Sequence, residues 1–380
     1  MQVISLAGLD GTDGFRLDGI NVLDQSGISV SGAGDVDGDG FADLIIGAFR
    51  AGSTGESYVV FGRASGFSAA LDLAGLDGAD GFRMVGISSN DESGRSVSGA
   101  GDVNGDGFAD LIIGARFADP NGVDLSGESY VVFGQGSGFS ASLDLADLDG
   151  ADGFRLDGID VQDQSGHSVS GAGDVNGDGF ADVIVGAFGG APNVVGQAGE
   201  SYVVFGQGAG FTVSVDLADL DGTDGFRLDG IDANDRSGNS VSGAGDINGD
   251  GFDDLIIGAF FADPNGNEYA GESYVIFGRA SGFTASLALA GLDGTDGFRL
   301  DGINENDLSG ASISGAGDVN GDGFDDLIIG AYFAAPNGEA YAGESYVVFG
   351  KVAGFTAGFD LASLDGSDGF RLNGIIAYDQ

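Results

Sequence analysis

A nine-residue acidic segment followed directly by a short apolar run occurs five times in this sequence. The first copy, Asp35-Val-Asp-Gly-Asp-Gly-Phe-Ala-Asp43, leads into Leu-Ile-Ile-Gly-Ala, and the later copies begin at Asp102, Asp174, Asp246 and Asp318. Side chains with oxygen atoms stand at positions 1, 3, 5 and 9 of every copy, and a loop of this kind suits a hard cation such as Ca²⁺. Five copies in one chain predict that calcium is part of the architecture.

Each predicted calcium site uses four side chains and the main-chain carbonyl of the Phe at position 7. An EF-hand is excluded, because it needs Glu at position 12 and flanking helices, whereas position 12 of the first copy is Ile46. A metal-free Asp/Asn/Gly turn is the alternative interpretation. The five predicted ligand sets are Asp35, Asp37, Asp39, Phe41 and Asp43; Asp102, Asn104, Asp106, Phe108 and Asp110; Asp174, Asn176, Asp178, Phe180 and Asp182; Asp246, Asn248, Asp250, Phe252 and Asp254; and Asp318, Asn320, Asp322, Phe324 and Asp326.

A second repeated segment, Gly-Glu-Ser-Tyr-Val-[Val/Ile]-Phe-Gly, gives the period of the chain. Its Glu lies at 56, 128, 200, 272 and 344, so that 72 residues separate successive copies. Each repeat predicts four short strands, which in the first copy are 29–35, 43–48, 57–61 and 81–87, because β-branched and aromatic runs bounded by Gly are typical of strands. No segment keeps a helical period for long, so the chain is predicted to be all-β.

Four-stranded units of equal length favour a β-propeller of antiparallel blades. A β-solenoid would show six- or nine-residue repeats, which are absent. We expect one repeat array over 1–380 with five complete blades, at about 26–87, 93–159, 165–231, 237–303 and 309–375. Residues 1–25 add a strand, because residues 14–20 duplicate the fourth-strand sequence. One strand is therefore surplus to a closed ring of five blades, which indicates an incomplete ring or part of a longer array.

Two further repeated features have structural interpretations. A Phe follows the third strand of every repeat, and we expect this Phe to fill the space between neighbouring blades (Phe61, Phe133, Phe205, Phe277 and Phe349). An Asp-Gly-x-Asp-Gly segment precedes the fourth strand, as at Asp77 and Asp80. We interpret it as a turn, although binding of a second ion is the alternative.

Composition restricts the classes of partner and of chemistry. The chain has 60 acidic and 13 basic residues, a net charge of −47, so nucleic acid is not an expected partner because phosphate binding needs Lys and Arg. No apolar run approaches about 18 residues, so we expect no insertion into a membrane. The sole histidine, His167, excludes two-histidine zinc motifs and is expected to be an exposed loop residue. No catalytic site is predicted.

The order Ser-Val, Gly-Asp-Val-Asn-Gly-Asp-Gly-Phe-Ala-Asp-Leu-Ile-Ile-Gly-Ala and Tyr-Val-Val-Phe resembles the FG-GAP repeat of integrin α-subunit propellers and their bacterial relatives. The resemblance implies a β-propeller with calcium between the first and second strands of a blade. It also implies an extracellular or cell-surface module for adhesion or recognition, although no Sec-type signal is visible. Where the family has Pro after Gly-Ala, this chain has other residues (Phe49, Arg116, Phe188, Phe260 and Tyr332).

The loops expected at the other end of the blades vary most between repeats. In an up-and-down blade, the connections 1–2 and 3–4 share one end, and the connections 2–3 and 4–1 share the other. Length varies only in the 2–3 loops, at 50–55, 116–127, 188–199, 260–271 and 332–343. Variable loops on a constant frame suit a binding surface, and neutral drift explains them equally well. We therefore expect a protein or carbohydrate ligand opposite the calcium loops; a structural spacer and, less favoured, a hydrolase or lyase are the alternatives.

Overall fold

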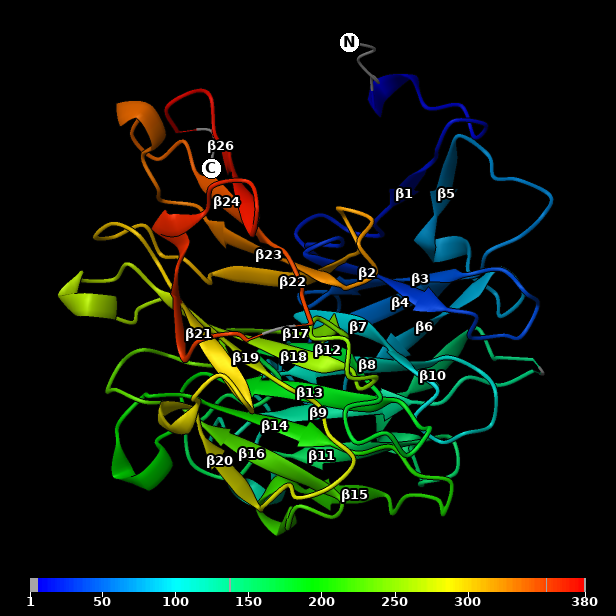
Figure 1. Ribbon diagram of the computed structural model, residues 1–380. Coiled ribbons are helices and arrows are strands. Elements are labelled where there is room, and N and C mark those ends of the chain that lie inside the picture. The colour runs from blue at the N-terminus through cyan, green and yellow to red at the C-terminus, as the bar shows by residue number, and fades with distance from the viewer. Residues whose placement is uncertain (1–5, 137, 353, 379–380) are drawn as a thin grey trace.

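The computed structural model describes residues 6–136, 138–352 and 354–378; residues 1–5 of the predicted N-terminal segment 1–25 lie outside this part of the chain. The described residues form strands and short 3-10 turns. The sheets stand side by side around a common centre, as blades of a propeller do (Figure 1). The prediction of an all-β propeller is confirmed.

Each repeat forms one antiparallel blade whose first strand is innermost and whose fourth strand is outermost. The innermost strands of successive blades pack against one another in chain order. The blade strands are β2 (Ser29–Gly34), β3 (Asp43–Ala48), β4 (Glu56–Val60) and β6 (Gly81–Val85); β7 (Ser96–Gly101), β8 (Asp110–Ala115), β9 (Glu128–Val132) and β11 (Gly153–Asp157); β12 (Ser168–Gly173), β13 (Asp182–Ala187), β14 (Glu200–Val204) and β16 (Gly225–Asp229); β17 (Ser240–Gly245), β18 (Asp254–Ala259), β19 (Glu272–Ile276) and β21 (Gly297–Asp301); and β22 (Ser312–Gly317), β23 (Asp326–Ala331), β24 (Glu344–Val348) and β26 (Gly369–Asn373).

The prediction of four strands per repeat was incomplete, because the 3–4 connection carries a short additional strand. This strand leaves its own blade and pairs in parallel with the outermost strand of the preceding blade, as Ser142 does with Arg83. Four blades are thereby five-stranded, and the extra N-terminal strand β1 (Arg16–Asp18) receives the first such strand. The additional strands are β5 (Ala70–Asp72), β10 (Ser142–Asp144), β15 (Ser214–Asp216), β20 (Ser286–Ala288) and β25 (Gly358–Asp360).

Short 3-10 turns occupy the start of the chain, follow each additional strand, and lie in four of the 2–3 loops. An Asp caps most of those after the additional strands; Asp144, for example, accepts a hydrogen bond from the main-chain N–H of Ala146. The turns are η1 (Leu6–Gly8), η2 (Leu73–Gly75), η3 (Pro120–Gly122), η4 (Leu145–Asp147), η5 (Pro192–Val194), η6 (Leu217–Asp219), η7 (Pro264–Gly266), η8 (Leu289–Gly291), η9 (Pro336–Gly338) and η10 (Leu361–Ser363).

The core lies between neighbouring blades. Phe133 packs against Phe154 of its own blade and against Phe211 of the next repeat, with ring centroids 5.9 Å apart in both pairs. The equivalent Phe residues of the other inner blades make the same contacts. The prediction that these aromatic residues fill the space between blades is confirmed for Phe61, Phe133, Phe205 and Phe277, whereas Phe349 of the last blade packs on Phe370 of its own blade.

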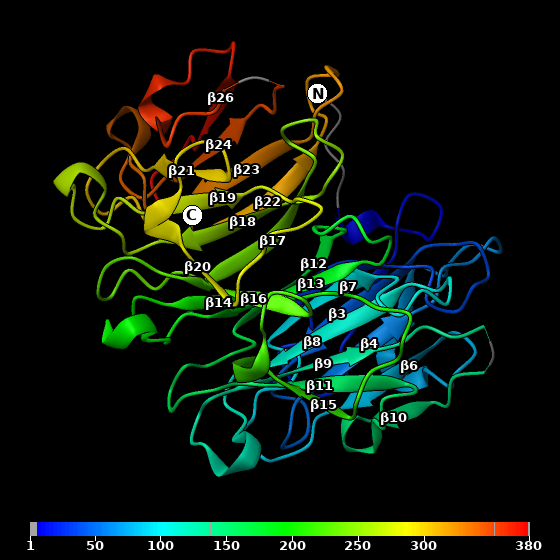
Figure 2. The ribbon, with the colours of Figure 1, turned by 60° about the horizontal axis from the view of Figure 1, so that its bottom comes forward.

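The ring is open between the last blade and the first. Both views show the β22–β26 sheet standing apart from the β1–β5 pair (Figures 1 and 2). Val30 on β2 is 66% exposed, whereas Val97 at the same place in the second blade is 4% exposed. On the other side of the opening, Leu372 is 50% exposed, whereas the equivalent Leu300 is fully buried. Each end of the array thus presents one half of a blade-to-blade interface.

Candidate metal centre

The predicted metal loops join the first and second strands of every blade, at one end of the propeller. We call this end the metal end. In the first loop, Asp35 accepts hydrogen bonds from the main-chain N–H groups of Asp39 (3.0 Å) and Gly40 (2.9 Å). Asp37 and Asp39 accept from N–H groups two residues further along. Gly40 has φ of +90°, a left-handed conformation that glycine adopts readily. The chain therefore curls around the side chain at position 1.

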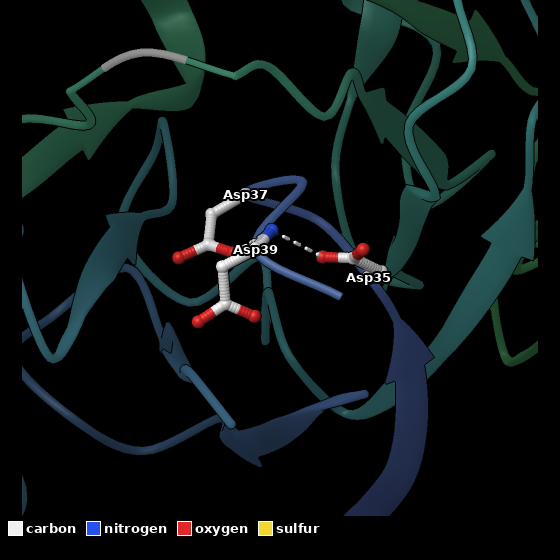
Figure 3. A group of neighbouring side chains, drawn as sticks. All are labelled: Asp35, Asp37 and Asp39. Atoms are coloured by element: carbon white, nitrogen blue, oxygen red, sulfur yellow. Dashed lines mark hydrogen bonds between the residues drawn. The ribbon is translucent and has the colours of Figure 1, made fainter. Parts of the chain in front are cut away.

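Three carboxylates come together in the first loop. Oxygen atoms of Asp35, Asp37 and Asp39 lie within 4.8 Å of one another, the only such group of three or more acidic, His or Cys side chains among the residues that the structure describes. Figure 3 shows the three side chains gathered around the turn. Burial raises the pKa of Asp37, and the charges of Asp39 and Asp35 raise it further. Such a cluster of like charges suits a divalent cation.

The other four loops have the same shape but two carboxylates and one amide at these positions. Asp102 accepts from the N–H groups of Asp106 (3.0 Å) and Gly107 (2.9 Å), as Asp35 does in the first loop. The Asn104 amide nitrogen donates to Asp106 Oδ2 (2.9 Å), and the Asn104 Oδ1 accepts from the Asp106 N–H (2.8 Å). Oxygen donors are therefore present at positions 1, 3 and 5 of these loops with one formal charge fewer.

The Asp at position 9 is buried and connects two parts of its blade. Asp110 Oδ2 accepts from the Val103 N–H (2.8 Å), and its Oδ1 accepts from the Gly134 N–H beyond the third strand (2.9 Å). Burial raises the pKa of Asp110 to about 7. The same pair of hydrogen bonds occurs in all five blades. This structural role was not evident from the spacing of the predicted ligands alone.

The Phe at position 7 links neighbouring loops. A Cβ atom built on Gly38 would lie 2.4 Å from a ring carbon of Phe108, and the rings of Phe180, Phe252 and Phe324 lie equally close to glycines of the preceding loops. The four later loops therefore each pack an aromatic ring on the loop before them. Sequence alone predicted only a carbonyl ligand at this position.

The second acidic element forms turns in the structure. The Asp221 carboxylate accepts from the N–H of Thr223 (2.9 Å) and from its hydroxyl (2.6 Å), and the N–H of Gly222 donates to the Gly225 carbonyl (2.8 Å). These are the hydrogen bonds of an Asp-initiated turn. They account for the acidic residues without an ion.

At the opposite end of the propeller, the 2–3 loops bond to the 4–1 loops. The Gln162 N–H donates to the Asp124 carbonyl (3.0 Å), and the Ser165 N–H donates to the Ser126 carbonyl (2.8 Å). The 3–4 connection lies at the metal end, where the Gln135 N–H donates to the Val36 carbonyl (3.0 Å). The predicted separation of the two sets of loops is confirmed.

His167 is not the exposed loop residue that was expected. Its ring packs on Phe188 with centroids 4.2 Å apart, and its Nδ1 lies 3.3 Å from Nη1 of Arg116. Burial lowers the pKa of His167 to about 3, and the neighbouring charges of Arg116 and Arg95 lower it further. The histidine is therefore neutral at physiological pH.

Comparison with known proteins identifies the repeat. The family model described as FG-GAP repeat matches residues 26–60, 93–132, 165–204, 237–276 and 309–348, which together are half of the chain. The chain belongs to the FG-GAP repeat family. Each match begins just before the first strand of a blade and ends in or at its third strand, with the predicted metal loop between.

Similar proteins include integrin α subunits and one phospholipase. The integrin alpha-4 of Xenopus laevis is 29% identical over 43% of this chain, and the integrin alpha pat-2 of Caenorhabditis elegans is 29% identical over 61% of it. The phosphatidylinositol-glycan-specific phospholipase D of Bos taurus is 32% identical over 46% of it. The matched regions cover 14%, 17% and 20% of these relatives, respectively. In the described part of this chain, none of the helices has the length and hydropathy needed to cross a bilayer.

Proposed function

We propose that this FG-GAP propeller is a calcium-binding, non-catalytic recognition module that works outside the cell or on its surface. The main support for calcium binding is the first loop, in which carboxylate oxygens of Asp35, Asp37 and Asp39 lie within 4.8 Å of one another. The similarity to integrin alpha subunits supports a role in adhesion or recognition.

Calcium fits the donors that the loops present. Carboxylate and amide oxygens are the ligands that Ca²⁺ prefers, and flexible loops suit its variable coordination. We propose that positions 1, 3, 5 and 9 and the position-7 carbonyl of each loop hold one ion, from Asp35–Asp43 in the first blade to Asp318–Asp326 in the last. A bound ion would neutralise the clustered carboxylates and fix the turn. Its contribution is structural.

The ligand surface is proposed to be the end formed by the 2–3 and 4–1 loops. The 2–3 loops differ between repeats in length and sequence and the 4–1 loops differ in sequence, while the strands that hold them are nearly identical. They also expose aromatic side chains, such as Tyr269 and Tyr341, which are 40% and 42% exposed. Exposed Tyr is frequent in protein–protein interfaces. A protein ligand is therefore favoured over a carbohydrate.

Thermal unfolding during a calcium titration tests the metal assignment. A ligand that binds only the folded state raises the melting temperature as its concentration exceeds Kd, which for extracellular modules is on the order of 10⁻⁴–10⁻³ M. We expect millimolar calcium to stabilise the chain and Asp106→Ala to reduce the gain. Asp149→Ala, in a turn of the second acidic element, is the matched control. A melting temperature that does not change with calcium would refute the assignment.

A loop exchange tests the recognition surface. Residues 260–271 can be replaced by the shorter segment 49–55, which joins the equivalent second and third strands of the first blade. Binding to a panel of extracellular-matrix proteins and glycans should be weakened by the exchange while the calcium-dependent melting remains. Equal binding by both proteins would place the ligand elsewhere.

A further inference from the structure

Four of the 13 basic residues stand apart from the repeat pattern. Six arginines occupy the same place in the outermost strands or β1 (Arg16, Arg83, Arg155, Arg227, Arg299 and Arg371), and three basic residues follow the third strand at the metal end (Arg63, Arg279 and Lys351). The other four lie in the loops of the opposite end, where the remaining repeats mostly carry uncharged residues (Arg50, Arg95, Arg116 and Arg236). A group of arginines at one end of a chain with a net charge of −47 is unusual, and it marks these loops as a candidate site for an anionic ligand.

Arg95 and Arg116 are neighbours, and acidic side chains balance their positive charge only in part. Arg116 pairs with Glu92 at 2.8 Å and contacts His167 Nδ1 at 3.3 Å. The buried Nε of Arg95 has no hydrogen-bond partner among the residues that the structure describes. Burial lowers the pKa of Arg95, and the neighbouring charge of Arg116 lowers it further. Two neighbouring arginines with one carboxylate, Glu92, beside them leave an excess of positive charge, which an incoming anion would stabilise.

Aromatic rings connect these two arginines to the others. The guanidinium groups of Arg50 and Arg95 each lie 5.3 Å from the centroid of the Phe49 ring. On the other side, Arg236 lies 5.4 Å from the centroid of Phe188, the ring that packs on His167. The residues therefore form a continuous series over the first four blades. We call it the arginine arc (Arg50, Arg95, Arg116, His167 and Arg236).

The arc borders a hollow in the same surface. A cavity of about 520 Å³ lies between the loops of the first two blades, with Phe49, Arg50, Glu92 and Phe117 in its wall. Phe117 also lies under Arg116, 4.4 Å from its guanidinium carbon. Arg50 is the arginine of the arc that lines this cavity, together with the two Phe rings and the carboxylates of Asp24 and Glu92. The cavity opens to solvent beside the exposed Arg50.

We infer that the arginine arc binds the carboxylates of an acidic peptide segment in a protein partner. Guanidinium groups bind carboxylates in a planar, two-pronged geometry, and rings beneath them keep that plane in position. Arg, Phe and Tyr are enriched in protein–protein interfaces, and Arg and Tyr are enriched in their hot spots. This inference rests on the proposed recognition function and specifies the chemistry of its ligand.

Binding of a fluorescein-labelled hexaglutamate peptide, measured by fluorescence anisotropy in saturating calcium, tests the inference. Hexaglutamine is the uncharged control peptide, and a galacturonate hexamer has the same charge on a carbohydrate. We expect hexaglutamate to bind more tightly than both. Arg95→Gln with Arg236→Gln should weaken binding by about tenfold or more, because two charged contacts are lost.

Arg279→Gln is the matched control, since Arg279 lies over Phe283 at 4.6 Å but at the metal end of the propeller. It should leave hexaglutamate binding unchanged. Equal affinity for hexaglutamate and hexaglutamine, or an equal loss in Arg279→Gln, would overturn the inference. Preference for the galacturonate hexamer would overturn the choice of a peptide. Calcium-dependent melting of each variant shows separately whether the metal assignment holds.

Discussion

The ring of Phe154 stacks on the ring of Phe211, with centroids 4.1 Å apart and planes inclined by 6°. Phe154 belongs to the fourth strand of the second blade, and Phe211 belongs to the 3–4 connection of the third repeat. The stack therefore joins two repeats at the periphery of the propeller, far from the innermost strands. It is repeated between the other blades, for example by Phe226 and Phe283.

Loss of this stack should destabilise the protein. Phe154 is fully buried, so Phe154→Ala should lower the free energy of unfolding by about 3–5 kcal/mol. Phe370 has the same place in the last blade but is only partly buried, and Phe370→Ala should lower it less. Urea unfolding of both variants gives the comparison. Equal losses would mean that contacts between blades contribute little.

Glycines in the second strands set how closely the blades approach. A Cβ built on Gly114 would lie 2.0 Å from the carbonyl oxygen of Gly166 in the next repeat, whereas one on Gly330 of the last blade would lie 3.5 Å from its nearest neighbour. Gly114→Ala should therefore lower the free energy of unfolding by about 3 kcal/mol, because the two blades must move apart. Gly330→Ala should be tolerated. Chemical unfolding curves distinguish the two, and a stable Gly114→Ala protein would contradict the packing.

The buried Asp at position 9 should stabilise the blade even without metal. Asp110→Ala leaves the N–H groups of Val103 and Gly134 without their acceptor, which should cost about 2–4 kcal/mol. Asp106→Ala, in the exposed part of the same loop, should change stability mainly when calcium is present. Melting of both variants in chelator and in calcium separates the two roles. Identical behaviour of the variants would show that position 9 acts only through the ion.

His167 should remain neutral from pH 5 to pH 8. Its pKa is lowered to about 3 by burial and by the charges of Arg116 and Arg95, so its ring carbon protons should not shift over this range in NMR spectra. The chain has one histidine, so the signal is unambiguous. Urea-unfolded protein supplies the control, with a pKa near 6.5. Titration near 6.5 in the folded protein would mean that the ring is accessible to water.

The free energy of unfolding, measured in saturating calcium, should fall as pH rises from 5 to 8. The cause is the loss of protons from buried carboxyl groups such as that of Asp163. Burial raises the pKa of Asp163 to about 7, and the charge of Glu200 raises it further, with Arg227 acting in the opposite direction. The unfolded chain loses this proton near pH 3.9, so between these values the folded state binds more protons than the unfolded state, and raising the pH favours unfolding.

Asp163→Asn should make the unfolding free energy less dependent on pH in this window. The amide oxygen can still accept the hydrogen bond from the Asp160 N–H, which the Asp163 carboxylate accepts at 3.1 Å. Asp149→Asn, in an exposed turn, is the control and should leave the pH dependence unchanged. Urea midpoints at pH 5, 6, 7 and 8 provide the measurement, and unaltered pH dependence in Asp163→Asn would contradict the assigned pKa.

Local patterns in the sequence were sufficient to predict the strands of each blade. The apolar run 43–48 is the strand Asp43–Ala48, and the strand predicted at 57–61 is Glu56–Val60, one residue earlier. The additional strand Ser142–Asp144 was missed because it has three residues and its partner, β6, lies about 60 residues earlier. Neither a hydrophobic period nor a turn signal marks so short a pairing.

The candidate sites were predictable to different degrees. The positions of oxygen-bearing residues in the metal loops followed from their spacing, but the packing of Phe108 against Gly38 of the preceding loop depends on how two blades meet. The arginine arc was not evident for the same reason. Arg95, Arg116 and Arg236 come from different repeats, and only the ring arrangement brings their loops to one surface. The departure of these residues from the repeat pattern was the available signal.

The short parallel strands give the array a property that a stack of independent sheets would lack. The additional strand of every inner repeat pairs with the fourth strand of the preceding repeat. Its own fourth strand pairs with the additional strand of the following repeat. Insertion or deletion of one whole 72-residue repeat therefore leaves every additional strand with a fourth strand to pair with, wherever in the repeat the insertion or deletion begins. Loss of part of a repeat that contains the additional strand or the fourth strand would leave a strand of a neighbouring repeat without its partner, whereas a change of length in a 2–3 loop leaves the pairing intact.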